Sequence, residues 1–80
     1  MNPQEIGRMV RFHRKKAALS QEQLAFLADV GKTVIFDIEK GKLSVQLDTL
    51  WKVLRVLNIR LDFQGPLMSL FKEVRENEEG

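Results

Sequence analysis

The 80-residue chain contains no cysteine and no tyrosine, and it has one histidine and one tryptophan. Without cysteine the chain forms neither a disulfide nor a thiolate zinc site, and it offers no cysteine nucleophile. No hydrophobic run approaches the roughly 20 residues that cross a bilayer. The N-terminal segment also lacks the continuous apolar stretch of a secretion signal. These absences predict a soluble, cytoplasmic protein with no metal and no cofactor.

Acidic residues are scarce in most of the chain and gather at its end. The net charge is +2, but residues 1–60 hold 11 Lys and Arg against 6 Asp and Glu, whereas residues 61–80 hold 2 against 5. A basic body suits a polyanionic partner, and an acidic end suits a different partner. A solvated surface on an ordinary small domain would look the same, so charge alone leaves both interpretations open.

Apolar residues recur at helical spacing and predict four helices in the first 58 residues. They are expected over about 6–17, 21–28, 32–40 and 47–58. Ser20 and Gln23 have the spacing of a capping box at the start of the second helix, and Gly41 suits the end of the third. After Pro66 a short amphipathic helix is expected, followed by a disordered acidic tail over 76–80.

The apolar pattern changes to period two at residue 59. Ile59, Leu61 and Phe63 alternate with polar residues, which predicts a β-strand over 59–65. A lone strand leaves its backbone groups unpaired, so we expect the same segment of a second copy to pair with it across a twofold axis. The alternative is an extended stretch that only covers the core. The predicted fold class is mostly α, with four to five helices and a C-terminal strand shared by a homodimer.

Two short helices joined by a tight turn have the geometry of a helix-turn-helix. Ala25 allows close crossing, and the angle between the helices is filled by Leu24, Val30, Ile35 and Ile38. The residues that carry a resemblance are the run 20–25 (SQEQLA), Val30, Ile35, Ile38, Glu39, Gly41 and the run 47–50 (LDTL). Over about residues 5–58 they resemble the Cro and phage-repressor helix-turn-helix family. The continuation over 53–63 resembles HipB-like antitoxins, in which a strand after the last helix pairs across the dimer.

The resemblance implies a set of DNA-facing residues. These are Gln21, Gly31, Lys32, Thr33, Asp37, Lys40 and Lys42. Gln21 is expected at a phosphate, because the start of a helix offers free amides as well as the side chain. The residues that open the third helix are expected in the major groove. Lys32 suits a guanine or a phosphate there, and Thr33 suits a polar or a methyl contact.

Further positions on the same helix have other expected roles. Asp37 either accepts a hydrogen bond from a cytosine amine or orients the lysine that opens the helix. Lys40 and Lys42 are expected to hold the DNA backbone. Proteins of this family often pair an arginine late in the first helix with a glutamate late in the third. Arg14 and Glu39 stand at those positions, which implies a structural ion pair that fixes the angle of the recognition helix.

Three departures from the family pattern stand out. Asp29 replaces a common glycine at the end of the second helix, where aspartate tolerates the left-handed conformation. His13 replaces an apolar residue and is expected at the edge of the core with its ring hydrogen-bonded, not as a metal ligand. Phe12, Phe26 and Phe36 occupy positions that are commonly polar, and they form either additional core or an exposed surface that a protein partner covers.

The resemblance implies a dimeric, sequence-specific repressor that binds a palindromic operator in double-stranded DNA and acts as the antitoxin of a HipA-like kinase toxin. The alternatives are a stand-alone phage-type transcriptional regulator and a protein-interaction module without DNA binding. An enzyme is not expected, because the chain lacks a nucleophile with a base, a glycine-rich phosphate loop and convergent carboxylates. The expected divisions are a helix-turn-helix domain (1–58), a dimerisation strand (59–65), and an amphipathic helix with an acidic tail (66–80).

Overall fold

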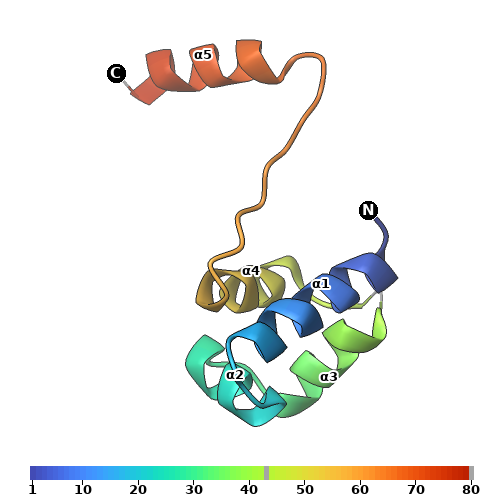
Figure 1. Ribbon diagram of the computed structural model, residues 1–80. Coiled ribbons are helices and arrows are strands. Elements are labelled where there is room, and N and C mark those ends of the chain that lie inside the picture. The colour runs from blue at the N-terminus through green and yellow to red at the C-terminus, as the bar shows by residue number, and fades with distance from the viewer. Residues whose placement is uncertain (43, 80) are drawn as a thin grey trace.

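The computed structural model of the protein describes residues 1–42 and 44–79. Its helices are α1 (Pro3–Lys16), α2 (Gln21–Ala28), α3 (Lys32–Lys40), α4 (Leu47–Val56) and α5 (Met68–Glu79). The first four form one body, and an extended segment carries α5 away from it (Figure 1). The molecule is therefore elongated, measuring 43 × 25 × 23 Å. None of the described helices is long and apolar enough to span a membrane.

The first two helices begin at side-chain caps. The Asn2 side chain accepts a hydrogen bond from the Glu5 amide at 2.8 Å, and Pro3 occupies the first turn, where a missing N–H costs nothing. At α2 the Ser20 hydroxyl accepts from the Gln23 amide at 3.0 Å, and the Gln23 side chain accepts from the Ser20 amide at 2.8 Å. The predicted capping box is confirmed. It fixes the residue at which α2 begins.

Each of the first four helices ends in the same way. One residue adopts the left-handed conformation, and the next amide reaches back to a carbonyl five residues earlier. The left-handed residues are Ala18, Asp29, Gly41 and Asn58. The returning amides belong to Leu19, Val30, Lys42 and Ile59. Asp29 has φ 57° and ψ 48°, as its residue type led us to expect. These caps give the sharp turns that α2 and α3 need.

The core lies between the four helices of the body. Its buried apolar residues are Val10, Leu24, Ala25, Ala28, Ile35, Ile38, Val53 and Leu54. The residues expected to fill the helix-turn-helix angle are all there, with Val30 packed against the core from its edge. Fully burying one leucine or isoleucine side chain contributes about 1.5–3 kcal/mol, so this cluster orders the motif.

Gly7 brings α1 and α3 into direct contact. A Cβ atom added there would lie 2.8 Å from the Glu39 carbonyl oxygen and closer still to that of Ile38. No real side-chain carbon sits so close to the backbone, so only glycine permits this approach. The contact places α1 against the end of α3.

The prediction of a β-strand over 59–65 is wrong. Within the described residues the structure is all-helical, and this segment is extended without a strand partner. Ile59 instead completes the cap of α4, donating its amide to the Leu54 carbonyl at 2.9 Å and packing against the core. Phe63 packs near Trp51, with ring centroids 6.3 Å apart. The alternating pattern arises from these local roles, and Leu61 is 40% exposed.

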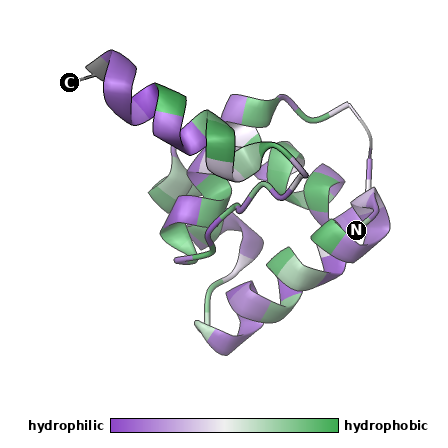
Figure 2. Cartoon of the chain, turned by 90° about the horizontal axis from the view of Figure 1, so that it is seen from above, coloured by the Kyte–Doolittle hydropathy of each residue, from purple (hydrophilic) through white to green (hydrophobic). Residues whose placement is uncertain are grey.

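The chain after Pro66 forms a longer helix than expected. We predicted a short helix and a disordered tail over 76–80, but α5 continues to Glu79, and residue 80 lies outside the described part. Figure 2 shows hydrophobic residues among the hydrophilic ones along α5. The exposed apolar side chains near and on this helix are Leu67, Leu70, Phe71 and Val74.

Candidate nucleic-acid interface

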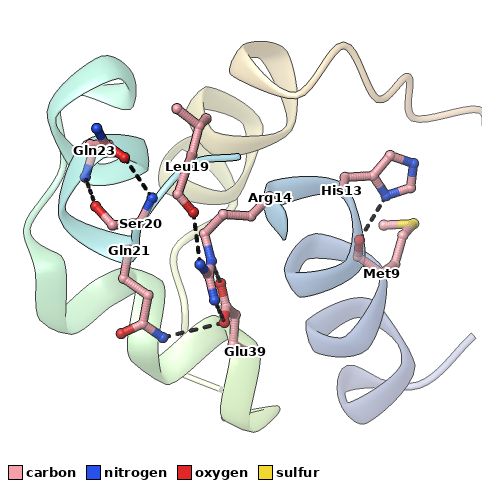
Figure 3. Close-up of polar contacts among 8 residues, drawn as sticks. All are labelled: Met9, His13, Arg14, Leu19, Ser20, Gln21, Gln23 and Glu39. Atoms are coloured by element: carbon pink, nitrogen blue, oxygen red, sulfur yellow. Dashed lines mark hydrogen bonds and ion pairs between the residues drawn. The ribbon is translucent and has the colours of Figure 1, made fainter. Parts of the chain in front are cut away.

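An ion pair between Arg14 on α1 and Glu39 on α3 lies behind the face that carries the predicted DNA contacts. Arg14 Nε donates to Glu39 Oε2 at 2.6 Å, and Arg14 Nη2 donates to Glu39 Oε1 at 3.0 Å (Figure 3). The third guanidinium nitrogen, Nη1, donates to the Leu19 carbonyl at 2.9 Å. The pair that the resemblance implied is therefore formed, and it joins α1, α3 and the loop before α2.

The pair is shielded from solvent. The Arg14 and Glu39 side chains are 10% and 6% exposed. The hydrogen bond to Glu39 raises the pKa of Arg14 above its ordinary value, against the opposing effect of burial. The guanidinium therefore stays charged at every physiological pH. A charged, bidentate pair in this position holds α3 at one angle against α1.

Gln21 opens α2 and touches the same carboxylate. Its side-chain amide donates to Glu39 Oε1 at 3.3 Å, which orients it beside the start of α3 (Figure 3). Gln21 and Glu22 border a hollow of about 580 Å³ between α1, α2 and α3, which we call the central hollow. Its cationic lining residues are Arg11, Arg14, Lys15, Lys32 and Lys40. The first turn of α2, with its positive dipole end, thus adjoins a cationic depression suited to a phosphate.

The first residues of α3 are presented to solvent. Gly31, Lys32 and Thr33 are all exposed. The Lys32 ammonium lies 3.5 Å from the Glu22 carboxylate, a pair whose side chains are 60% and 74% exposed. Such an exposed pair is worth little and is easily exchanged for a phosphate or a base. The opening turn of α3 therefore projects as an accessible polar edge.

The end of α3 carries two further lysines. Lys42 Nζ lies 3.3 Å from Asp37 Oδ1, so Asp37 pairs with Lys42 and not with Lys32. The alternative in which Asp37 orients the lysine that opens the helix is not what the structure shows. Lys40 Nζ lies 5.4 Å from the centroid of the Phe36 ring, within cation–π range. Both lysines remain exposed and able to meet a DNA backbone.

The comparison with known proteins matches this geometry. A helix-turn-helix family profile covers residues 10–64. The chain belongs to the helix-turn-helix family. It is 39% identical over 64 residues to the uncharacterized HTH-type transcriptional regulator y4mF of Sinorhizobium fredii, covering 80% of this chain and 84% of that protein. It is 42% identical over 63 residues to the control protein C.BamHI of Bacillus amyloliquefaciens, covering 72% and 78%.

Membership of the helix-turn-helix family makes the protein a DNA-binding transcription regulator, since this is a family of regulators and not an enzyme class. Within residues 1–42 and 44–79 no group of three His, Asp or Glu side chains is arranged to hold a metal. The start of α3 is exposed and polar, and the buried ion pair braces the helix that carries it.

Two cationic residues beside the helix-turn-helix were missed by the sequence analysis. Arg11 and Lys15 on α1 line the central hollow together with residues of α2 and α3. Their spacing of four residues places them on one face of α1, and that regularity was a usable signal.

The unusual aromatic residues are exposed. Phe12, Phe26 and Phe36 are 58%, 85% and 46% exposed, so the interpretation as additional core is wrong. His13 lies at the core edge as predicted, with Nδ1 2.7 Å from the Met9 carbonyl oxygen (Figure 3). Its ring packs edge-on to Phe12. Each of α1, α2 and α3 therefore carries one exposed phenylalanine ring.

Proposed function

We propose that this protein is a sequence-specific transcriptional repressor that inserts the opening turn of α3 into the major groove of duplex DNA. The observation that carries the proposal is the exposed edge formed by Gly31, Lys32 and Thr33 at the start of a helix whose angle is set by a buried ion pair. Lys32 can donate to the O6 or N7 of guanine, and Thr33 offers a hydroxyl and a methyl group.

The surrounding residues would position the helix on the backbone. Gln21 and the first turn of α2 take one phosphate, and Lys40 and Lys42, at the end of α3, take others. Asp37 pairs with Lys42 and is released when that lysine meets a phosphate, which leaves the carboxylate available to a cytosine amine. A dimer in which Lys32, Lys40 and Lys42 of both subunits engage the DNA neutralises about six phosphates and has a log–log salt slope on the order of −5.

The repressor is proposed to act as a homodimer on a palindromic operator. Exposed apolar side chains continue from α4 along the following segment to α5, and they include Leu47, Trp51, Phe63, Leu70 and Phe71. A second subunit that covers this surface would bury area that a monomer leaves in water. Two recognition helices related by a twofold axis then require inverted half-sites about 34 Å apart.

A stand-alone regulator is favoured over the antitoxin of a HipA-like kinase toxin. The antitoxin hypothesis depended on the strand over 59–65, which is not formed, and the two relatives carry the names of a transcriptional regulator and a control protein. A kinase-sized HipA-like reading frame next to this gene would reverse that preference. Its absence would support the stand-alone role.

Selection from a pool of random duplexes tests the proposed function. The wild type is expected to enrich one palindromic sequence, because the opening turn of α3 reads bases from two subunits. The double variant Lys32→Ala and Thr33→Ala keeps the phosphate contacts and should enrich no sequence. A wild-type pool that stays random after repeated rounds would contradict the assignment.

A further inference from the structure

One face of α1 is basic from Arg8 to Lys16 and lies outside the two helices of the helix-turn-helix. Arg8, Arg11, Phe12, Lys15 and Lys16 follow the spacing i, i+3, i+4, i+7 and i+8, so they share one side of the helix. We call this set the basic face of α1. All five residues are exposed. The only acidic residue of α1 is Glu5, in its first turn.

No ion pair neutralises the cations of this face within the part of the protein that the structure describes. Among residues 1–42 and 44–79, the ion pairs are Arg14–Glu39, Lys32–Glu22 and Lys42–Asp37, and none includes a residue of the basic face. Lys16 Nζ lies 5.6 Å from the Phe12 ring centroid, so the aromatic ring steadies one of the four charges. Four unpaired cations on one helix face are a binding surface for a polyanion.

The basic face of α1 is continuous with the surface proposed to meet DNA. Its residues line a depression of about 500 Å³, and two of them, Arg11 and Lys15, also line the central hollow with Lys32 and Gln21. From Arg8 to Lys16 the face runs about 12 Å along the helix axis. On a duplex this length corresponds to between three and four base pairs at 3.4 Å each.

We propose that the basic face of α1 binds the sugar–phosphate backbone of duplex DNA that flanks the half-site read by α3. This rests on the proposed function, since it needs α3 in the groove. The contacts would be to phosphates alone, adding affinity and salt dependence without sequence preference. An anionic membrane is a poorer partner, because Ile6, Met9 and Val10 of α1 pack in or against the core and cannot enter a lipid layer.

The test uses the full-length protein and two operator duplexes. One ends at the last base pair of each half-site, and the other is extended by about ten base pairs, one helical turn, at each end. The variant Arg8→Gln plus Lys16→Gln removes two cations that do not line the central hollow. The matched control, Lys72→Gln plus Arg75→Gln, makes the same change in charge on the exposed surface of α5.

The wild type and the control are expected to bind the extended duplex more tightly than the short one. The α1 variant should lose that gain, and its log–log salt slope should fall in magnitude by about 1.8 per subunit, while its ranking of base substitutions stays the same. Equal affinity of the wild type for both duplexes, or a variant indistinguishable from the control, would overturn the inference. So would a changed base ranking, which would mean that α1 acts by placing α3.

Two further outcomes separate the inference from its alternatives. The inference is wrong if vesicles of anionic phospholipid bind the wild type but not the α1 variant, while the two proteins bind DNA with the same affinity. The basic face of α1 would then bind a membrane. If the wild type prefers no duplex sequence at all, the proposed function itself fails. Tight binding of the short operator without a gain on extension defeats only the inference about α1.

Discussion

Glu39 Oε2 accepts a hydrogen bond from Arg14 Nε at 2.6 Å, and the other oxygen of the same carboxylate also accepts one from Gln21 at 3.3 Å. One side chain of α3 is thereby tied to α1 and to the first turn of α2. The residue that holds the helix angle also holds the predicted phosphate contact. If Gln21 meets a phosphate as proposed, this carboxylate links the fold to DNA binding.

Replacing Glu39 by alanine is expected to lower the free energy of unfolding by about 3 kcal/mol, because Arg14 would remain buried without its partner. Urea titration followed by circular dichroism measures the change. Glu22→Ala is the matched control, since its pair with Lys32 is exposed and should be worth less than about 1 kcal/mol. Equal midpoints for the two variants would show that the buried pair contributes nothing.

Gly7→Ala should loosen the contact between α1 and α3. The added methyl group would meet the carbonyl oxygens of Ile38 and Glu39, and such overpacking against the backbone costs about 1–3 kcal/mol or more. The thermal midpoint should fall. Gly65→Ala is the control, because no described atom lies within 4 Å of its added carbon. If both variants have the same thermal midpoint, the close approach of α1 to α3 at Gly7 does not contribute to stability.

Ala18→Gly is expected to stabilise the protein. Ala18 has φ 58° after the end of α1, a conformation that costs an alanine about 1 kcal/mol and glycine nothing. The free energy of unfolding should rise by about that amount. Ala17→Gly serves as the comparison, because its φ of −81° carries no such strain and glycine there only adds chain entropy. A destabilised Ala18→Gly variant would refute this account of the cap.

The proposed dimer should depend on the aromatic residues beyond α4. Phe63 and Phe71 are 59% and 56% exposed, so exchanging both for glutamine should not disturb the core but should remove apolar area from a subunit interface. Sedimentation equilibrium should then show a raised dimer dissociation constant. Phe26→Gln removes an 85% exposed ring from α2 and should leave the constant unchanged. A monomeric wild type at micromolar concentration would contradict the dimer.

The body of the protein could be predicted because its signals are local. The capping box at Ser20, the spacing of Leu24, Ile35 and Ile38, and the left-handed Asp29 each follow from neighbouring residues. The Arg14–Glu39 pair spans 25 positions and came from the family resemblance, which holds for the body. These elements were therefore right in type and close in their bounds.

The chain after α4 could not be predicted in the same way. Alternation of apolar residues at 59, 61 and 63 is typical of a β-strand. A strand also needs a partner strand, and residue spacing alone does not show whether one is present. In the structure Ile59 completes the C-terminal cap of α4, and Phe63 packs near Trp51. The residue spacing in the sequence places the basic residues of α1 on one face. That two of them line the central hollow follows only from how α1, α2 and α3 pack in three dimensions.

The central claim is that the opening turn of α3 reads base pairs, and binding to every single-base-pair variant of the selected operator tests it most directly. For the wild type, substitutions at the positions read should each weaken binding by about 1–3 kcal/mol. Thr33→Ala and Lys32→Ala should flatten that profile, whereas Lys42→Ala should weaken all duplexes about equally. A wild-type profile that is flat, or one that Lys32→Ala and Thr33→Ala leave unchanged, would contradict the claim.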